Sequence, residues 1–298
     1  MQPMTTSPKL KANWRRLKSV YHDTRTAEQI TEHYLLERSL AARLRNASAE
    51  MRSTLYGELY GELYARLPHH PRYRQRRDNS LISKQVAVLR KLVPADARLL
   101  EVGASDCSVS LAMADHCREV IAVDVTEPAA IMERAPANFR FELTDGIAMP
   151  FASSSVDFVY SHQLMEHLHP EDAERQLAEI YRVLRPGGRY FCITPSRLTG
   201  PHDVSRFFKD EAQGFHLKEY TYQDFDRLFG GIGFGKMRAC ITRGRHYAGS
   251  VPLRPMILLE RIYVLLPRSL RRYLGTNRGV RAVLGLAILA YRPTADSR

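Results

Sequence analysis

The sequence predicts an α/β protein with a doubly wound sheet of seven mostly parallel strands, preceded by a helical extension at the N-terminus. Short apolar runs of strand-like length recur from residue 98 onward, and helical patterns separate most of them. The first 80 residues show helical patterns and no strand-like run. Alternating strands and helices are typical of a parallel sheet that helices cover on both faces.

Two main helices are expected in the N-terminal extension. Thr26 and Gln29 have the spacing of a capping box at the start of the first. The second follows Ser48 and repeats Leu-Tyr-Gly-Glu, which places its leucines (55, 59 and 63) and its tyrosines (56, 60 and 64) in stripes. We interpret the stripes as part of a packed core, with an aromatic cover over a ligand as the alternative. Residues 26–66 are expected to pack against the sheet domain and help close its binding site.

The chain is expected to divide near residue 80. One proline and four arginines make 69–80 a linker, so that 1–80 are the helical extension and linker and 81–298 the sheet domain. A helix is expected near Leu81–Leu92. A basic helical insertion at about 250–282 precedes the last strand.

Helix signals separate the expected strands. Pro170–Leu184 has a proline at its start and Pro186-Gly187-Gly188 as its stop. Thr221 and Asp224 cap a later helix, Tyr222–Phe229. The seven strands are expected at Arg98–Val102, Val120–Val123, Phe139–Leu143, Val156–Tyr160, Arg189–Ile193, Lys236–Thr242 and Leu284–Tyr291.

Acidic residues and a glycine follow the first three strands. Gly103 comes directly after the first strand and lets the backbone approach a ligand, because ligands of such sheets bind at the carboxyl ends of the strands. Asp124 ends the second strand, 21 positions beyond Gly103, where a carboxylate reaches a ribose diol. Asp145 follows the third strand. The pattern Gly-x-Gly-x-x-Gly of nicotinamide-binding folds is absent after Gly103.

This series resembles the class I S-adenosylmethionine-dependent methyltransferases, in the branch called type 11. The first motif of that family is an acidic residue followed by Gly-x-Gly-x-Gly; this chain has Glu101 and Gly103 but Ser105 and Cys107 at the other two glycines. The likeness runs over about residues 99–194. Its further landmarks are Asp124, Asp145, Met149-Pro150-Phe151, Asp157-Phe158-Val159-Tyr160, Leu164-Met165-Glu166-His167 and Leu184-Arg185-Pro186-Gly187-Gly188.

The resemblance implies a Rossmann-like fold, S-adenosyl-L-methionine as the cofactor and methyl transfer as the activity. It places Asp124 at the ribose and Asp145 near the adenine amine. The residues expected to bind the cofactor are Glu101, Gly103, Ala104, Ser105, Asp124, Val125, Asp145, Gly146, Ile147 and Ser161.

Two histidines are candidates for a catalytic base, since imidazole titrates near neutral pH. His162 follows the fourth strand at the ligand edge, and His216 lies in the long segment after the fifth strand, which in this family often covers the acceptor. Some quinone-type O-methyltransferases of the family carry Glu-x-x-Glu-His, associated with a divalent metal. Here Gln163 replaces the first acid, so we expect no metal and a structural role for Glu166 and His167.

Charge is unevenly distributed along the 298 residues. The net charge is +7 over residues 1–80, −6 over 81–235 and +11 over 236–298. A basic surface attracts nucleic acid, anionic lipid or acidic substrates alike. The four scattered cysteines, without a C-x-x-C pair, favour a reducing cytoplasm, and the alternation of leucine and arginine in 251–282 suits peripheral membrane contact.

Three functions remain open on the sequence. The first is O-methylation of a small-molecule, glycan- or lipid-linked acceptor. The second is nucleic-acid methylation, suggested by charge, although Ser161-His162-Gln163-Leu164 is not the Asn/Asp-Pro-Pro-aromatic run of amino-methylating nucleic-acid enzymes. The third is a non-catalytic module that binds S-adenosylmethionine. The sequence indicates neither the acceptor nor the oligomeric state.

Overall fold

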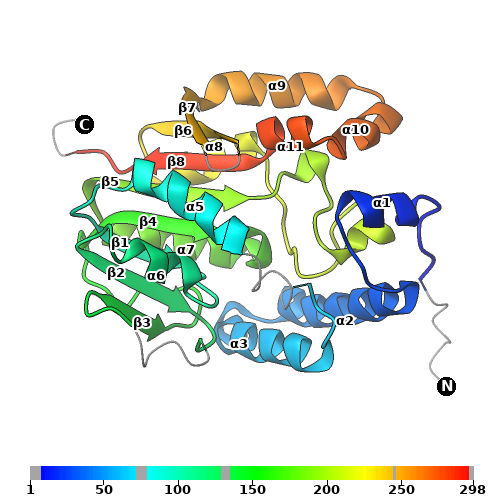
Figure 1. Ribbon diagram of the computed structural model, residues 1–298, viewed down its shortest axis with the longest axis horizontal. Helices are drawn as coiled ribbons and strands as arrows, with labels where there is room; N and C mark the ends of the chain where they lie inside the picture. Colours follow the sequence, from blue (N-terminus) through cyan, green and yellow to red (C-terminus); the bar gives the residue numbers. More distant parts are fainter. Residues whose placement is uncertain (1–7, 72–78, 129–134, 244–245, 295–298) are drawn as a thin grey trace.

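The computed structural model describes residues 8–71, 79–128, 135–243 and 246–294, and these form an eight-stranded sheet at the centre of the molecule (Figure 1). The strand order is β3-β2-β1-β4-β5-β8-β6-β7. Strands β1 to β5 pair in parallel, and β8, β6 and β7 pair antiparallel. The strands are Arg98–Val102 (β1), Glu119–Asp124 (β2), Phe139–Leu143 (β3), Val156–His162 (β4), Leu184–Thr194 (β5), Met237–Arg243 (β6), His246–Pro252 (β7) and Leu286–Tyr291 (β8).

The predicted α/β class and mostly parallel sheet are confirmed, with one strand more than the seven expected. The extra strand is β7, which forms a hairpin with β6 at the edge of the sheet. Its sequence, His-Tyr-Ala-Gly-Ser-Val-Pro, lacks the apolar run of the inner strands, and its residues are half-buried or exposed. An edge strand buries little side-chain surface, so hydrophobic patterning does not reveal it.

Helices cover both faces of the sheet (Figure 1). Helices α5 (Asn79–Leu92) and α6 (Ser108–Met113) lie on one face, and α7 (Pro170–Val183) and α8 (Tyr222–Ile232) on the other. Successive side chains of a strand point to opposite faces. Accordingly, Leu99 packs in the core beneath α5 and α6, while Leu100 packs in the core beneath α7 and α8.

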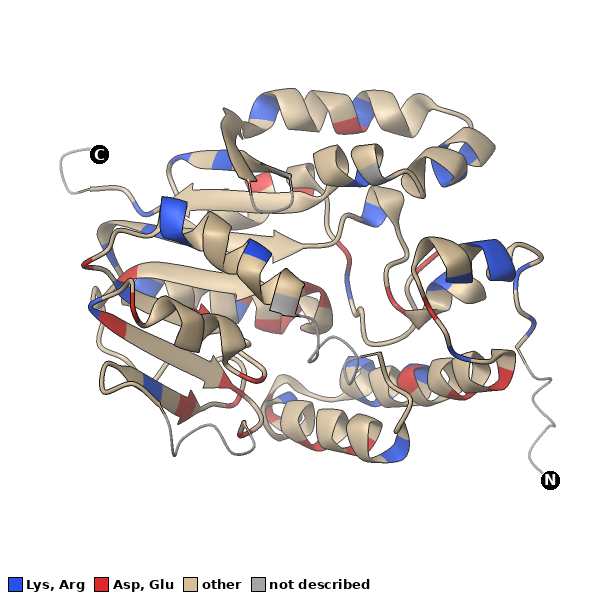
Figure 2. Ribbon diagram, viewed as in Figure 1, with Lys and Arg blue, Asp and Glu red and all other residues tan. Residues whose placement is uncertain are grey.

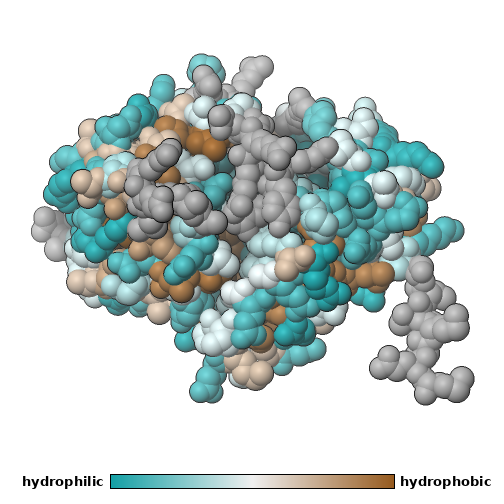
Figure 3. Space-filling view, turned by 60° about the horizontal axis from the view of Figure 1, so that its bottom comes forward, coloured by the Kyte–Doolittle hydropathy of each residue, from teal (hydrophilic) through white to brown (hydrophobic). Residues whose placement is uncertain are grey.

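Three N-terminal helices lie at the carboxyl ends of the parallel strands: α1 (Trp14–Val20), α2 (Ala27–Asn46) and α3 (Ala49–Arg66) (Figure 1). The predicted caps are present. The Thr26 hydroxyl accepts the Gln29 N–H at 3.2 Å while the Gln29 side chain accepts the Thr26 N–H, and the Ser48 hydroxyl caps α3. On the face shown in Figure 3, hydrophilic residues alternate with small hydrophobic patches.

A buried arginine fastens α3 to the sheet domain. The Arg52 guanidinium bonds Asp172 at the start of α7, with Nε to Oδ2 at 2.5 Å, and bonds Glu171 at 2.7 Å. The Tyr56 hydroxyl donates to the same Asp172 carboxylate at 2.8 Å and accepts the His169 N–H. Arg52 and Asp172 are both buried, so each needs the opposite charge of the other to offset the loss of its contact with water.

The segment between β7 and β8 forms the predicted insertion, as three helices: α9 (Leu253–Leu265), α10 (Arg268–Gly275) and α11 (Arg278–Leu284). The segment between β5 and α8 contains two short 3₁₀ helices, Arg197–Thr199 and Val204–Phe207, and packs against α1, α2 and α10. Within the described residues, no helix has the length and apolar character needed to cross a bilayer.

Replacing Arg52 tests its role in docking the N-terminal helices. We expect Arg52→Met to lower the free energy of unfolding by about 3–5 kcal/mol, because it leaves the Asp172 carboxylate buried and without its cation. Urea denaturation measures the change. The control is Arg43→Met, which removes a half-exposed ion pair with Glu62 between α2 and α3 and is expected to cost less than about 1 kcal/mol. Equal losses in the two variants would refute the role.

Candidate functional site

A cavity of about 770 Å³ lies at the carboxyl ends of β1, β2 and β4. We call it the cofactor cavity. Its walls come from the turns after these strands and from α3 and α5, so the N-terminal helices close it on one side. Its polar and aromatic lining includes Glu37, Tyr56, Tyr60, Tyr64, His70, Gln85, Glu101, Gly103, Ala104, Ser105, Asp106, Asp124, Val125, Gly146, His162 and His167.

The turn after β1 has three residues in the left-handed region. Gly103 has φ +75°, and a Cβ there would lie 3.0 Å from the Leu164 side chain. Ser105 and Cys107 have φ +55° and +56°. Residues other than glycine rarely adopt this backbone conformation. The backbone therefore follows a Gly-x-Gly-x-Gly turn even though serine and cysteine occupy its second and third glycine positions.

Two carboxylates hold this turn in place. Asp124, at the end of β2, accepts the Ser105 N–H at 2.8 Å and the Thr126 N–H at 3.0 Å. Glu101, at the end of β1, is buried and accepts the Ser110 hydroxyl of α6. Burial raises the pKa of Glu101 to about 7. Both acidic side chains line the cavity where the strands end, although Glu101 is only partly ionised at neutral pH.

The other predicted cofactor residues occupy different environments. Ala104, Val125 and Gly146 line the cavity beside Gly103, Ser105, Glu101 and Asp124. Asp145, Ile147 and Ser161 are not among its lining residues in the described parts of the chain. The Asp145 carboxylate accepts the N–H groups of Ile147 and Ala148 and shapes the turn that presents Gly146. Ser161 is buried in β4 and bonds the Tyr190 hydroxyl at 2.7 Å.

The two candidate histidines differ in position and in charge. His162 lines the cofactor cavity at the end of β4, and burial lowers its pKa to about 4, so its imidazole is neutral at neutral pH. His216 lies behind His167, with ring centroids 4.9 Å apart, and lines a second cavity. Burial opposes its charge, but a 2.7 Å bond to Glu219 raises the pKa of His216 to about 9. His216 is therefore a cation at neutral pH.

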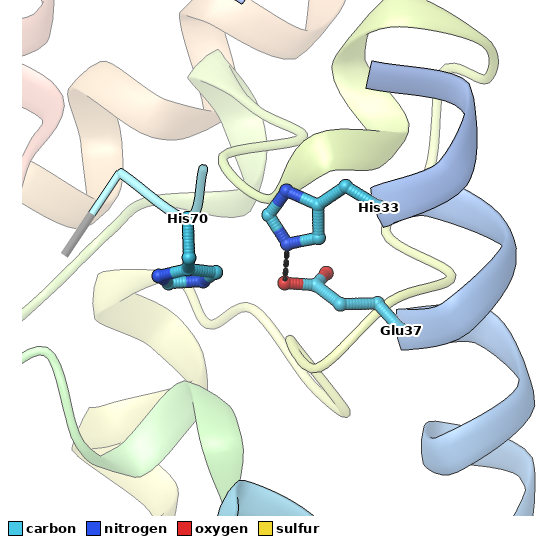
Figure 4. Close-up of side chains that lie close together, drawn as sticks. All are labelled: His33, Glu37 and His70. Atoms are coloured by element: carbon cyan, nitrogen blue, oxygen red, sulfur yellow. Dashed lines mark hydrogen bonds and ion pairs between the residues drawn. The ribbon is translucent and has the colours of Figure 1, made fainter. Parts of the chain in front are cut away.

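A chain of three polar side chains from the N-terminal extension reaches the cofactor cavity. The Arg25 guanidinium contacts His33 Nδ1, and His33 Nε2 lies 2.7 Å from Glu37 Oε1 (Figure 4). A guanidinium only donates hydrogen bonds, so the Nδ1 atom accepts and the Nε2 proton is donated to Glu37. Burial favours the protonated, neutral form of Glu37, but the interaction with His33 outweighs the effect of burial and lowers the pKa of Glu37 to about 2. A carboxylate thus lines the cavity.

Among the described residues, two groups of side chains have the composition of metal sites: His33, Glu37 and His70, and Glu166, His167 and His216. In the first, the proton on His33 Nε2 leaves no lone pair there for a metal ion. In the second, Glu166 accepts the Thr194 hydroxyl at 2.7 Å and His167 donates to the Phe215 carbonyl. These bonds tie the short 3₁₀ helix Met165–His167, which precedes α7, to the end of β5 and to the segment after it, which supports a structural role.

Comparison with known proteins agrees with this geometry. Residues 100–192 match the protein family described as "Methyltransferase domain". A probable S-adenosylmethionine-dependent methyltransferase of Mycolicibacterium smegmatis is 31% identical over 138 residues, which are 46% of this chain and 51% of that protein. A ubiquinone/menaquinone biosynthesis C-methyltransferase of Dinoroseobacter shibae is 33% identical over 126 residues, 39% of this chain and 49% of that protein.

A solved structure shares the fold. It is the 1,6-didemethyltoxoflavin-N1-methyltransferase of Burkholderia thailandensis with bound 1,6-didemethyltoxoflavin and S-adenosylhomocysteine, with a TM-score of 0.52, 17% identity, and coverage of 83% of this chain and 91% of that one. This chain carries, over residues 100–192, a methyltransferase domain of the class I S-adenosylmethionine-dependent kind. It spans about half the length of the curated relatives it matches.

The lining of the cofactor cavity fits S-adenosylmethionine, the cofactor of this methyltransferase domain. Its sulfonium and amino groups are cationic, and the cavity presents the carboxylates of Glu101, Asp106 and Asp124. Gly103 provides close approach to the backbone, since a side chain there would meet Leu164. Asp124, the residue expected at the ribose, lines the cavity together with Glu101, Ala104 and Ser105.

Several residues that line the cofactor cavity were not predicted as site residues. Glu37, Tyr60, Tyr64 and His70 come from the N-terminal extension and its linker, far from the motifs in the chain. The tyrosine stripe of α3 was the sequence signal that could have indicated these residues. Tyr56 is buried in the core and also lines the cavity, so it belongs both to a packed core and to a cavity wall. No local pattern distinguishes Glu37 from a solvated helix residue.

Removing the Asp124 carboxylate tests the cofactor assignment. We expect Asp124→Ala to weaken S-adenosylmethionine binding about ten- to hundredfold, the loss of one or two hydrogen bonds to a charged acceptor. Isothermal titration measures the affinity. Asp115→Ala is the matched control, because that carboxylate is 69% exposed and pairs with Arg90 away from the cavity. An unchanged affinity for Asp124→Ala would contradict the assignment.

Proposed function

We propose that the chain transfers the methyl group of S-adenosylmethionine to an oxygen atom of a small-molecule, glycan- or lipid-linked acceptor. The observation that carries the proposal is that one cavity joins the cofactor residues to a compartment walled by the N-terminal helices. The sulfonium supplies an activated methyl group, so the protein has to position the acceptor in line and exclude water. The walls from α2 and α3 serve both purposes.

The acceptor compartment lies around Glu37, Tyr60, Tyr64 and His167. The Tyr60 hydroxyl is buried and has no hydrogen-bond partner among the described residues, while its ring stacks on Phe215 with centroids 4.9 Å apart. A buried polar atom without a partner is costly, so a ligand that bonds it is favoured. Glu37 adds a carboxylate acceptor. Together they favour a neutral or cationic acceptor group with hydroxyl or amino hydrogens.

His162 is the base that fits an oxygen acceptor. It lies in the same cavity as the cofactor residues and is neutral, so it can accept the hydroxyl proton as the new bond to the methyl carbon forms. Gln85 Nε2 lies 3.4 Å from His162 Nδ1 and donates to it, so Nδ1 is the basic nitrogen and the acceptor hydroxyl takes the place of Gln85 there when it loses its proton. His216 is a cation and faces the second cavity, so in this proposal it stabilises the wall behind His167 instead of accepting a proton.

The relatives do not decide which atom is methylated, since one is a C-methyltransferase and another an N1-methyltransferase. Nucleic-acid methylation, the second candidate, is disfavoured by the described part of the lining, in which four carboxylates and one lysine, Lys84, face the cavity. A phosphate backbone would be repelled there. A cytoplasmic location, consistent with the four free cysteines, stays part of the proposal.

Replacement of His162 tests the proposed chemistry. With methyl-labelled donor and a panel of hydroxyl, amine and carbon acceptors, we expect label on a hydroxyl compound. His162→Gln should keep the donor affinity and lower transfer about 10²- to 10⁴-fold, the contribution of a general base. His246→Gln, on the exposed edge strand, is the control and should transfer at the wild-type rate.

The pH dependence gives an independent check. A base must be neutral, and the pKa of His162 is lowered from 6.5 to about 4. Wild-type transfer should therefore persist as pH falls through 6.5 and decline only near pH 4. Full transfer by His162→Gln would refute the base, and tight donor binding without transfer to any acceptor would favour a non-catalytic module.

A further inference from the structure

The outer face of the inserted helices is apolar and exposed. Helix α9 buries Leu253, Met256, Glu260 and Tyr263, at spacings of three and four residues that define its inner face. On its other side, Leu258, Ile262 and Leu265 are 59%, 52% and 84% exposed, and Leu270 and Tyr273 of α10 are 41% and 61% exposed. We call these five residues the insertion surface. It lies at the outside of the molecule, beyond the β6–β8 end of the sheet (Figure 1).

Arginines flank the insertion surface. Arg254, Arg261 and Arg268 are exposed, and the spacing 254, 258, 261, 265 places two of them on the same helical face as Leu258 and Leu265. Figure 2 shows these cations along α9 and α10. The only acid between residues 253 and 284 is Glu260, which points inward and accepts the Tyr222 N–H at 2.8 Å. The exposed side of α9 and α10 thus combines apolar and cationic groups.

A basic cavity lies beside α10. Its volume is about 1340 Å³, and it is bordered by α1, the segment after β5 and α10. Four carboxylates line it, some of them already paired, as in Lys11–Asp210 at 2.9 Å. Among the described residues, eight lysines and arginines and the protonated His216 also line it: Lys11, Arg197, Arg206, Lys209, Lys218, Arg268, Arg271 and Arg272. It therefore carries the opposite charge to the cofactor cavity.

We propose that α9 and α10 bind the surface of an anionic lipid bilayer, with the insertion surface entering the acyl boundary and lipid phosphates meeting the flanking arginines and the basic cavity. Such an arrangement is that of an interfacial amphipathic helix. Each cation near an anionic surface strengthens partitioning onto it about fivefold. The binding goes beyond methyl transfer and needs neither donor nor acceptor.

Charge favours a bilayer over other occupants of this surface. A second copy docked on the same face would bring Arg254 and Arg261 against their equivalents, with no carboxylate on that face to pair them. A protein partner would have to supply an acid for each arginine placed among leucines. A bilayer requires no such pairing, because arginines stay at the headgroups while neighbouring leucines enter the acyl region.

Vesicle co-sedimentation of the full chain tests the proposal, without donor or acceptor. The vesicles are phosphatidylcholine alone and an equimolar mixture with phosphatidylglycerol. We expect retention on the anionic vesicles only, and at least about tenfold weaker partitioning for Arg254→Glu/Arg261→Glu, which reverses two cations at the surface. Leu258→Ser/Leu265→Ser should lose retention similarly. The matched controls, Arg90→Glu on α5 and Leu143→Ser on β3, should pellet as the wild type does.

Three results would overturn the proposal, given thermal unfolding that shows each variant folded. The first is equal recovery of the wild type and Arg254→Glu/Arg261→Glu with anionic vesicles. The second is binding of soluble glycerol phosphate without any retention on vesicles, which would make the basic cavity a site for a free anion. The third is a dimer in the absence of vesicles that Leu258→Ser/Leu265→Ser abolishes, which would assign the surface to a second copy. Failure of methyl transfer has no bearing on these results.

Discussion

The placement of the N-terminal helices depends on one buried ion pair, Arg52 with Asp172. A buried charge without a partner is strongly unfavourable, so the sheet domain and α3 each carry a group that needs the other. Tyr56 shares the carboxylate and places the tyrosine face of α3 over the carboxyl ends of the strands. The acceptor compartment, with Tyr60 and Glu37 in its wall, follows from that docking.

The fold keeps two electrostatic environments apart. Carboxylates line the cofactor cavity, where a cationic donor binds, and cations line the second cavity and the inserted helices. The boundary is thin: His167 lines one cavity and His216 the other, with ring centroids 4.9 Å apart. The ion pair of His216 and Glu219, at 2.7 Å, lies on the second-cavity side of this boundary.

Histidines close together in this protein differ in charge because their neighbours differ. Burial without an adjacent carboxylate lowers the pKa of His162 to about 4. His167 is buried beside the cationic His216, and its pKa falls to about 3. His216 itself has Glu219 at 2.7 Å and stays protonated. Residue type therefore does not identify the base; burial and the nearest charge do.

Local patterns in the sequence determined the fold class, the caps at Thr26 and Thr221 and the strands of the parallel half of the sheet, because periodicity and capping depend on neighbours in the chain. They also placed Gly103 and Asp124 at the site, since the ends of parallel strands share one edge. Only the tertiary structure decided that Glu37 and Tyr60 join that site, that His162 is neutral and His216 charged, and that α9 leaves Leu258 and Leu265 uncovered. These properties arise from contacts between segments far apart in the chain, where the docking of one surface on another determines burial and charge.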